Sequence, residues 1–384
     1  MAFANPRPGP TVGMCFPCQA AAFRPISLLG FLLGAPMASI LYTEIHSQPD
    51  RLRTCLHANL TALGEVAARI KSAGITSFTM VARGTSRHAA MYGAYLLGAH
   101  QHMPVHLFRT GMATCLGVQP LHPGTCLVGI SQSGSGPDLN AILNRAVCRS
   151  VPVFALTNNE DSEMAGLATR HVGLQAGPEH AIAATKSFTN QLMCLAMLDH
   201  CLDMQKVPYE DLLSIPGHVE GALSIEGPIR TLADRIKDTG SLIAVGRGFN
   251  HPVACEAALK LQEVCYLPTV AYTSADFIHG PQALLEPDRE LLCLDAGPEP
   301  NPQFSDIEAL AHRAGARVTA ITSDPGRWSG PTAVIELPGT RDVPDWLAPF
   351  PAITACQLLA YHLGLARGLD VDSPRNLKKV TLTR

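Results

Sequence analysis

The sequence predicts an α/β protein made of two tandem units, each a parallel sheet with helices on both faces in a flavodoxin-like arrangement. Three observations support this prediction. Short apolar runs such as Cys126–Ile130 end abruptly, as buried parallel strands do. Apolar residues at helical spacing follow them at once, for example from Leu139 to Val147. Finally, the strand and turn pattern of the first half returns in the second half.

The repeat has a nearly constant offset. The strand Ser77–Ala82 and its Arg83-Gly84 turn return as Ser241–Gly246 and Arg247-Gly248, 164 residues later. Val153–Thr157 is followed 165 residues later by Val318–Thr322. Such self-similarity indicates two copies of one structural unit. We therefore expect a first domain over residues 42–210 and a second over residues 225–384, separated by a linker around residues 207–227 that contains Pro208, Pro216 and Gly217.

The composition of the chain argues against some classes of binding partner. The chain has 384 residues, 47% of them hydrophobic, which suits two or three domains with sizeable cores. A net charge of −3 and the lack of basic runs argue against a nucleic-acid surface. No segment is long and apolar enough to cross a membrane. We therefore expect a small-molecule ligand, with no nucleic acid and no membrane as partner.

The N-terminal residues 1–41 differ from the rest of the chain. Arg24 precedes the apolar stretch Ile26–Gly34, which a signal peptide would also show, but the stretch is too short to span a bilayer. We interpret this segment as a disordered extension or a mis-called start, with Met37 as the natural first residue. Cys15 and Cys18 have CxxC spacing but no second pair, which argues against a metal or redox role.

The twelve cysteines are scattered through apolar strand and helix patterns instead of clustering in loops. They are interpreted as buried thiols in a reducing compartment, which predicts a cytoplasmic protein. The cysteines on which this interpretation rests are Cys126, Cys148, Cys194, Cys255, Cys265, Cys293 and Cys356.

A patch of hydroxyls and glycines follows the strand that ends at Ile130. The side chains of Ser131, Ser133 and Ser135 can donate to phosphate oxygens, and the free amides of the helix that starts near Pro137 would point at the same ligand. The alternative is an ordinary solvent-exposed turn, since Ser and Gly are common turn residues. The equivalent segment of the second unit, Leu294–Gly297, lacks the hydroxyls, so we assign the phosphate site to the first unit.

A second candidate site lies on the predicted helix that follows His251. Glu256, Lys260 and Glu263 fall at i, i+4 and i+7 and therefore share one helix face. The alternative is a solvated face with a weak Glu–Lys pair worth about 0.3 kcal/mol. The following segment, Ala271–His279, is interpreted as a polar loop whose last residue precedes a Gly-Pro turn; a lone loop histidine is usually just exposed.

Several motifs in order resemble the SIS (sugar isomerase) domain family, in particular the isomerase half of glucosamine-6-phosphate synthase and the related SIS-type deaminases. The resemblance spans about residues 40–384. It is carried by Ser131–Gly134, Ala184–Thr189, Glu256–Glu263, His279–Pro281 and Pro374–Lys379.

The resemblance implies a role for each matching residue. Glu263 would move a proton between C1 and C2 of the sugar, and His279 would open the sugar ring from a neighbouring subunit of a homodimer with shared active sites. Lys379 would cover the open-chain sugar or form an imine with it, and Lys260 and Glu256 would help to bind the substrate. No cofactor is needed, because a carboxylate base, a phosphate anchor and a positioned acid suffice for aldose–ketose exchange. The residues expected at the sugar phosphate are Thr85, Ser86, Ser131, Gln132 and Ser133.

The positions at which this sequence differs from the synthases indicate which reaction to expect. The synthases begin with a glutaminase domain opened by a processed cysteine, which Met14-Cys15-Phe16 does not match, and some forty residues cannot hold such a domain. Ser135-Gly136 and Ser274–His279 also look like the deaminase branch, although Gly136 lacks a phosphate-binding hydroxyl. The expected reaction is glucosamine 6-phosphate to fructose 6-phosphate and ammonia. The alternatives are a fructosamine-6-phosphate deglycase, a galactosamine-6-phosphate deaminase and a non-catalytic sugar-phosphate sensor.

Overall fold

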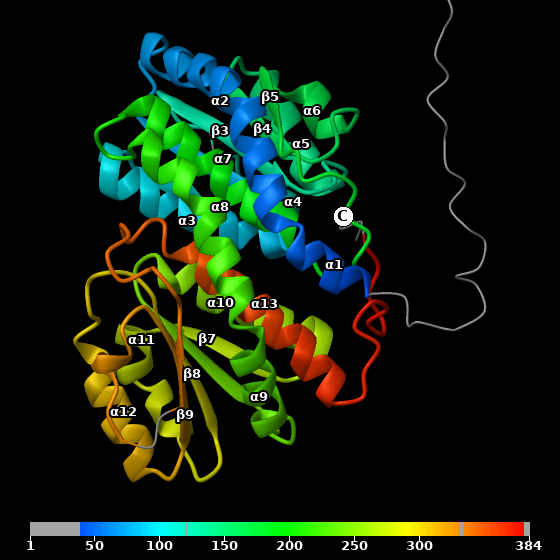
Figure 1. Cartoon of the computed structure of the whole chain (residues 1–384). Coiled ribbons are helices and arrows are strands. Elements are labelled where there is room, and N and C mark those ends of the chain that lie inside the picture. Colours follow the sequence, from blue (N-terminus) through cyan, green and yellow to red (C-terminus); the bar gives the residue numbers. More distant parts are fainter. Residues whose placement is uncertain (1–38, 120, 331–332, 380–384) are drawn as a thin grey trace, which may run out of the picture. The chain divides into compact units, whose positions relative to one another are not determined.

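The computed structural model describes residues 39–119, 121–330 and 333–379, which belong to one compact unit. Its core consists of two parallel five-stranded sheets (Figure 1). The predicted α/β class is therefore confirmed, whereas the division into two domains remains a prediction. The CxxC pair Cys15 and Cys18 and the suggested start at Met37 lie outside the described residues.

The first sheet has the strand order β2-β1-β3-β4-β5. The register pairs Phe78 of β1 with Val105 on one side and with Cys126 on the other, so the order reverses between β1 and β3. In an open α/β sheet, ligands bind at the carboxyl ends of the two strands at such a reversal. The strands are β1 Ser77–Ala82, β2 Val105–Leu107, β3 Thr125–Ser131, β4 Val153–Thr157 and β5 Arg170–Gly173.

The second sheet has the order β10-β9-β8-β6-β7. Numbered within its own half, this is the same order as in the first sheet, because the first strand again lies between the second and the third. The reversal here falls between β6 and β8. The strands are β6 Leu242–Gly246, β7 Thr269–Thr273, β8 Glu290–Asp295, β9 Arg317–Thr322 and β10 Ala333–Glu336.

Two long helices are almost completely buried. Helix α13 is apolar on nearly all sides, whereas α7 also buries polar side chains such as Asn190 and Asp199, which form hydrogen bonds within the protein. Helix α13 packs against α8, α9 and α10, and Figure 1 shows it running beside α10. The helices of the first half are α1 Ile40–His46, α2 Gln48–Ser72, α3 Gly84–Gln101, α4 Thr110–Leu116, α5 Pro137–Val147, α6 Glu163–Leu167 and α7 Lys186–Leu202. The remaining helices are α8 Tyr209–Ser224, α9 Glu226–Ile236, α10 Asn250–Cys265, α11 Ser274–Ile278, α12 Gln303–Arg313 and α13 Pro349–Ala366, with 3₁₀ turns at Pro281–Leu284 and Pro325–Arg327.

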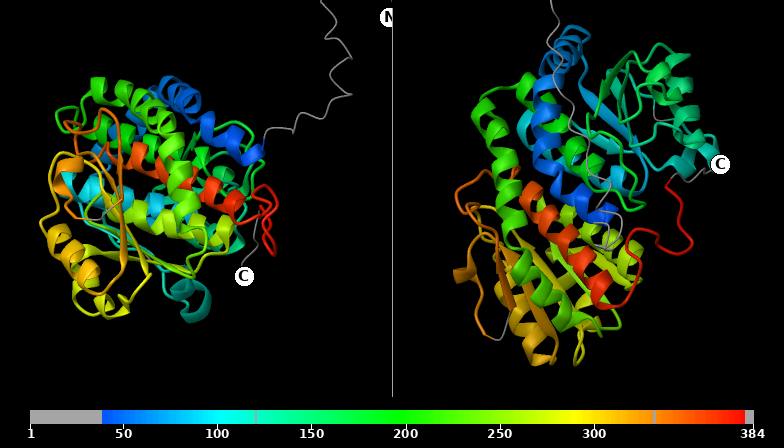
Figure 2. Two further views of the ribbon diagram at one scale, coloured as in Figure 1. Left: turned by 60° about the horizontal axis from the view of Figure 1, so that its bottom comes forward. Right: turned by 45° about the vertical axis from the view of Figure 1, so that its right-hand side comes forward.

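The C-terminal segment returns to the start of the described chain. Figure 2 shows the segment after α13, in red, passing the beginning of α1. There the Asp372 carboxylate accepts hydrogen bonds from the Ser39 hydroxyl and the Leu41 amide, both at 2.8 Å. The carboxylate thus satisfies amides at the N-terminus of α1 that have no partner within the helix. None of the described helices is long and apolar enough to span a membrane.

Two local expectations differ from the structure. The proposed linker is the regular helix α8, with Pro216 inside it and Leu212 buried. The segment expected to be a loop before His279 forms β7 and α11, and Thr273 caps α11 by accepting from the Asp276 amide at 3.0 Å.

The cysteines follow the expectation with one clear exception. The ten described cysteines are free thiols; Cys126, Cys194, Cys265, Cys293 and Cys356 are buried as expected, and Cys255 is half-buried. Cys148, however, is exposed, because α5 ends one residue before it and the chain turns into solvent.

Candidate functional site

A cavity of about 350 Å³ lies at the carboxyl ends of β1 and β3, where the order of the first sheet reverses. Residues that follow both strands line it, together with residues from α10 and from the C-terminal segment. Ile182, Ala184 and Ser187, between β5 and the first turn of α7, line it as well, so the chain brings five separate parts of the sequence to one cavity. The predicted site residues on its wall are Thr85, Ser86, Ser131, Gln132, Ser133, Lys260, Glu263 and Lys379.

The serine hydroxyls of this cavity are oriented as donors. The Ser131 oxygen accepts from the Gly134 amide at 3.0 Å, and the Ser133 oxygen accepts from the Ser135 amide at 3.3 Å. The Ser86 oxygen accepts from the Gln191 side chain at 2.9 Å. Because each oxygen already accepts within the protein, its hydrogen remains available for an anionic ligand. The three hydroxyls can therefore bind phosphate oxygens together.

Two helices begin at the same place. Both α3 and α5 start at the edge of the cavity, and their free N-terminal amides favour an anion. Gly134 between them has φ +65°, and a Cβ there would lie 2.2 Å from the Ser162 hydroxyl. A side chain at this position would therefore clash, which explains the glycine in the tight turn after β3.

A chain of buried charges connects α10 to α3. The Lys260 ammonium donates to a Glu263 carboxylate oxygen at 2.5 Å and lies 3.3 Å from a Glu256 oxygen. Glu256 also accepts from the Thr85 hydroxyl at 2.9 Å and lies 2.6 Å from the His88 Nδ1. The Lys260 side chain is 2% exposed and that of Glu263 25%, so only the last carboxylate of the chain reaches the cavity.

The interpretation of this helix face as solvated is wrong. Both Glu256 and Lys260 are buried, because α3 packs against α10. Burial lowers the pKa of Lys260, but the carboxylates of Glu256 and Glu263 outweigh it and hold that pKa above its usual value. Burial likewise raises the pKa of Glu256, but Lys260 and the bonds from His88 and Thr85 hold it below its usual value. Both groups are therefore charged at neutral pH.

The C-terminal segment closes one side of the cavity. The Lys379 ammonium donates to a Glu179 carboxylate oxygen at 2.8 Å and to the Ala181 carbonyl at 2.7 Å. Glu179 is buried and also accepts from the Ser187 amide at 3.0 Å and hydroxyl at 2.8 Å. Burial raises the pKa of Glu179, but Lys379 and Ser187 outweigh it and hold that pKa below its usual value. The segment is thus fixed by an ion pair with the first half.

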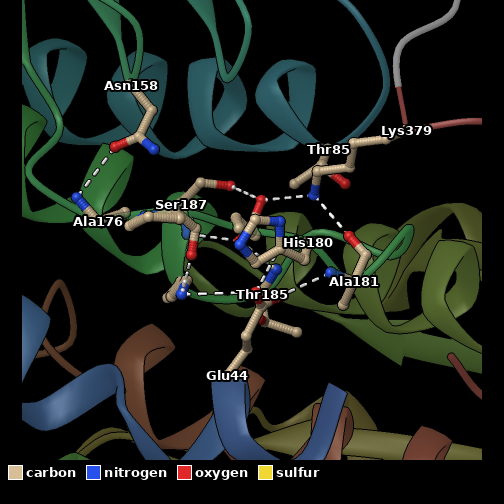
Figure 3. A network of polar contacts seen from close by, with 12 residues as sticks. Glu44, Thr85, Asn158, Ala176, His180, Ala181, Thr185, Ser187 and Lys379 are labelled. Atoms are coloured by element: carbon tan, nitrogen blue, oxygen red, sulfur yellow. Dashed lines mark hydrogen bonds and ion pairs between the residues drawn. The ribbon is translucent and has the colours of Figure 1, made fainter. Parts of the chain in front are cut away.

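The loop that carries Glu179 is itself held from two sides, as Figure 3 shows. From α1, the Glu44 carboxylate accepts from the amides of His180 at 2.6 Å and Ala181 at 3.3 Å. From the end of β4, Asn158 accepts from the Ala176 amide at 3.0 Å. These bonds fix the loop backbone, so the carbonyl that receives Lys379 has a defined position.

Three predicted residues do not line the cavity. Glu256 lies behind Lys260, and the Ser135 hydroxyl donates to the Ser133 carbonyl at 3.1 Å. His279 follows α11 and is exposed. A role for His279 in this cavity would require a second copy of the chain, which remains a prediction.

Sequence reasoning missed several residues that hold the site. His88 and Glu179 each bind a predicted residue, and buried Asp138 pairs with Arg83 at the cavity wall. His88 falls three residues after Thr85, one helical turn, so its position next to Thr85 was detectable. Glu179 belongs to a loop without periodicity and carries no such signal. Among the described residues, no group of His, Cys, Asp or Glu side chains could hold a metal ion.

Comparisons with known proteins point to one family. The model of the SIS domain matches residues 76–200. The glutamine–fructose-6-phosphate aminotransferase (isomerizing) of Gloeobacter violaceus is 32% identical over 354 residues, which are 88% of this chain and 57% of that protein. The chain thus spans little more than half the length of such relatives.

Solved structures show the same fold. The C-terminal domain of glucosamine-fructose-6-phosphate aminotransferase from Francisella tularensis superposes with a TM-score of 0.79 at 26% identity, covering 91% of this chain and all of that one. Glucosamine-6-phosphate deaminase from Thermotoga maritima gives a TM-score of 0.72 at 19% identity, covering 90% of this chain and all of that one. The latter likeness concerns the fold alone.

Proposed function

Because the chain belongs to the SIS domain family through residues 76–200, we propose that it is a sugar-phosphate isomerase that acts on an amino sugar phosphate. The specific reaction is conversion of glucosamine 6-phosphate and water to fructose 6-phosphate and ammonia. The observation that carries the proposal is one cavity in which the donor hydroxyls of Ser131 and Ser133 lie together with the carboxylate of Glu263.

The reaction assigns one task to each part of the cavity. The serine hydroxyls and the starts of α3 and α5 bind the phosphate. With the sugar in its open form, the Glu263 carboxylate takes the proton from C2 and returns it to C1, while a second proton passes from the amine nitrogen to O1; the aldehyde and amine thereby become a hydroxymethyl group and a ketose imine. Water adds to C2 of the imine and ammonia leaves, so no oxidant or reductant is consumed. Lys260 orients the carboxylate through its 2.5 Å hydrogen bond.

A substrate panel tests the reaction. The purified protein is incubated with glucosamine 6-phosphate, galactosamine 6-phosphate and a fructosamine 6-phosphate; ammonia and ketose phosphate are measured for the first two, and the released amine and aldose phosphate for the third. We expect equal amounts of both products from glucosamine 6-phosphate. Preference for another member of the panel would replace the substrate, and no turnover of any member would favour a sugar-phosphate sensor.

The base is tested by Glu263→Gln, which keeps the shape of the side chain and removes the proton acceptor. We expect kcat to fall by about 10²- to 10⁴-fold while substrate binding stays near normal. Glu210→Gln is the matched control, because Glu210 is exposed on α8 and does not line the cavity. Unchanged turnover in the Glu263 variant would exclude this carboxylate as the base.

A second candidate is the opposite direction, the isomerising half of glucosamine 6-phosphate synthesis. It is favoured by the 32% identity to an aminotransferase. Supplying fructose 6-phosphate with ammonium, or with glutamine, and measuring glucosamine 6-phosphate separates the two. Formation faster than the deaminating reaction under matched concentrations would favour the synthetic direction.

A further inference from the structure

One basic side chain of the cavity at the first sheet has hydrogen-bond donors that the protein does not use. Arg83 follows β1 directly and lines the cavity, and its side chain is 45% exposed. Its Nε donates to the Asp138 carboxylate, and among the described residues this is the only hydrogen bond that the guanidinium makes. The donors on the two terminal nitrogens therefore remain available for a ligand. The reaction proposed above gives Arg83 no task.

The other basic side chains of the cavity are less suited to bind an anion there. The Lys260 ammonium lies against two carboxylates, and its side chain is 2% exposed. The Lys379 ammonium donates to the Glu179 carboxylate and to a backbone carbonyl. Lys378 is exposed and belongs to the C-terminal segment, away in sequence from the turns at which α3 and α5 begin. Arg83 is thus the cation that lies directly at these turns.

The turn between β3 and α5 offers donors mainly in its first part. In its second part, the Ser135 hydroxyl donates to the Ser133 carbonyl at 3.1 Å, and the Ser135 amide donates to the Ser133 hydroxyl oxygen at 3.3 Å. Gly136 has no side chain, and Pro137 has no N–H. A phosphate bound in this turn would therefore have few partners on the side toward α5, unless a neighbouring side chain supplies them.

Asp138 holds the Arg83 guanidinium on that side. Asp138 lies in the first turn of α5 and lines the cavity, and its side chain is 1% exposed. Alone, this buried carboxylate would repel an anion in the cavity, so its pairing with Arg83 also removes an obstacle to binding. The ion pair fixes the guanidinium before a ligand arrives, which lowers the entropy that binding costs.

We propose that Arg83 contacts the substrate, with its terminal nitrogens donating to phosphate oxygens while Nε stays bound to Asp138. The inference rests on the proposed function and adds a residue that selects phosphorylated sugars. A phosphate monoester carries about two negative charges at neutral pH, which hydroxyl groups alone do not neutralise. Hydrogen bonds between arginine and phosphate are charge-assisted and can be bidentate, so they are stronger than those of the serines.

Calorimetric titration with glucitol 6-phosphate tests the contact, because this compound carries the phosphate but has no carbonyl group and cannot react. Arg83→Ala should raise its Kd about tenfold or more, since charge-assisted hydrogen bonds are lost. Arg145→Ala is the matched control: it removes the same charge from an exposed position on α5 that does not line the cavity, and it should leave the Kd unchanged. An unchanged Kd in Arg83→Ala, or an equal increase in the control, would overturn the inference.

A double variant separates contact with the phosphate from compensation of Asp138. Arg83→Ala takes a cation from a buried carboxylate, which by itself could disturb the turn or the fold. Arg83→Ala combined with Asp138→Asn removes both charges and avoids this effect. If Arg83 contacts the phosphate, the Kd of the double variant should stay about tenfold or more above that of the wild type. Wild-type affinity in the double variant would mean that Arg83 only compensates Asp138, and would refute the contact.

The same titration distinguishes failure of this inference from failure of the proposed function. If the wild-type protein does not bind glucitol 6-phosphate, the cavity is no sugar-phosphate site, and both proposals fail. If the wild type binds it and Arg83→Ala binds it equally well, only the role of Arg83 fails.

Discussion

In the cavity at the first sheet, the serine hydroxyls should contribute to substrate binding and not to the chemical step. The Ser131 and Ser133 oxygens accept backbone amides and keep their hydrogens for the ligand. Because a phosphate group is bound alike before and during the reaction, the double variant Ser131→Ala, Ser133→Ala should raise KM about tenfold or more and leave kcat nearly unchanged. Steady-state kinetics measure this. Ser135→Ala is the control in the same turn, since its hydroxyl points to the Ser133 carbonyl; an equal effect of the control would show that the turn, and not the hydroxyls, is responsible.

His88 positions the proposed base through two intermediates. It lies 2.6 Å from Glu256, which holds Lys260, which donates to Glu263. His88→Ala leaves a buried carboxylate short of one donor, which costs about 1–3 kcal/mol, so kcat should fall with little change in KM. His88→Asn places an amide near the lost Nδ1 and should restore most of kcat. A loss of thermal stability in His88→Ala without a change in kcat would reduce His88 to a structural residue.

The sequence identifies candidate site residues from their chemical type more reliably than it predicts whether their side chains are buried. The serine patch after β3 was found because strand, glycines and hydroxyls are adjacent in the chain. The spacing of Glu256 and Lys260 fits a solvated helix face equally well, and only the packing of α3 on α10 decides between them. Glu179 could not be predicted, since its partner Lys379 is 200 residues away.

At the scale of elements, the hydrogen bonds between Asp372 and the start of α1 should hold the C-terminal segment in place. Asp372→Ala removes an acceptor for Ser39, Ile40 and Leu41, which should cost about 1 kcal/mol, as the loss of a helix cap does. The segment should then exchange its amide hydrogens faster, and Lys379 should leave the cavity more often, which raises KM. Hydrogen exchange over residues 373–379 together with KM measures both. Faster exchange without a change in KM would separate the segment from substrate binding.

Elements at sheet edges were the hardest to predict. Strand β7 pairs only with β6, so its other edge is open and its residues Tyr272 and Thr273 are half-buried. Its sequence therefore lacks the continuous apolar run that reveals β3 and β4, and the pattern from Ala271 onward predicts a loop instead. The predicted apolar runs agree to within about one residue with β1, β3, β4, β6 and β9, which all lie between two neighbours, whereas the sequence analysis predicts no bounds for β8.

At the scale of the whole molecule, His279 tests the proposed homodimer. If it acts in the cavity of a second copy, His279→Ala and Glu263→Gln chains are each nearly inactive but complement one another. Random mixing makes about half the dimers mixed, each with one intact site, so activity should return to about a quarter of wild type. Co-refolding both variants and measuring ammonia release checks this. Recovery no greater than the sum of the separate variants, with mixed dimers confirmed, would assign His279 to its own chain or to no catalytic role.

The charge chain between α3 and α10 makes the two halves mutually dependent. Glu256 and Lys260 belong to the second half, but Thr85 and His88, which satisfy them, belong to the first. A chimera that combines one half with the other half of a relative would bury uncompensated charge unless both sides of this contact match. This contact therefore limits which halves can be combined. Fusions and recombinants between relatives should fold only when both halves carry matching residues at these four positions, two in α3 and two in α10.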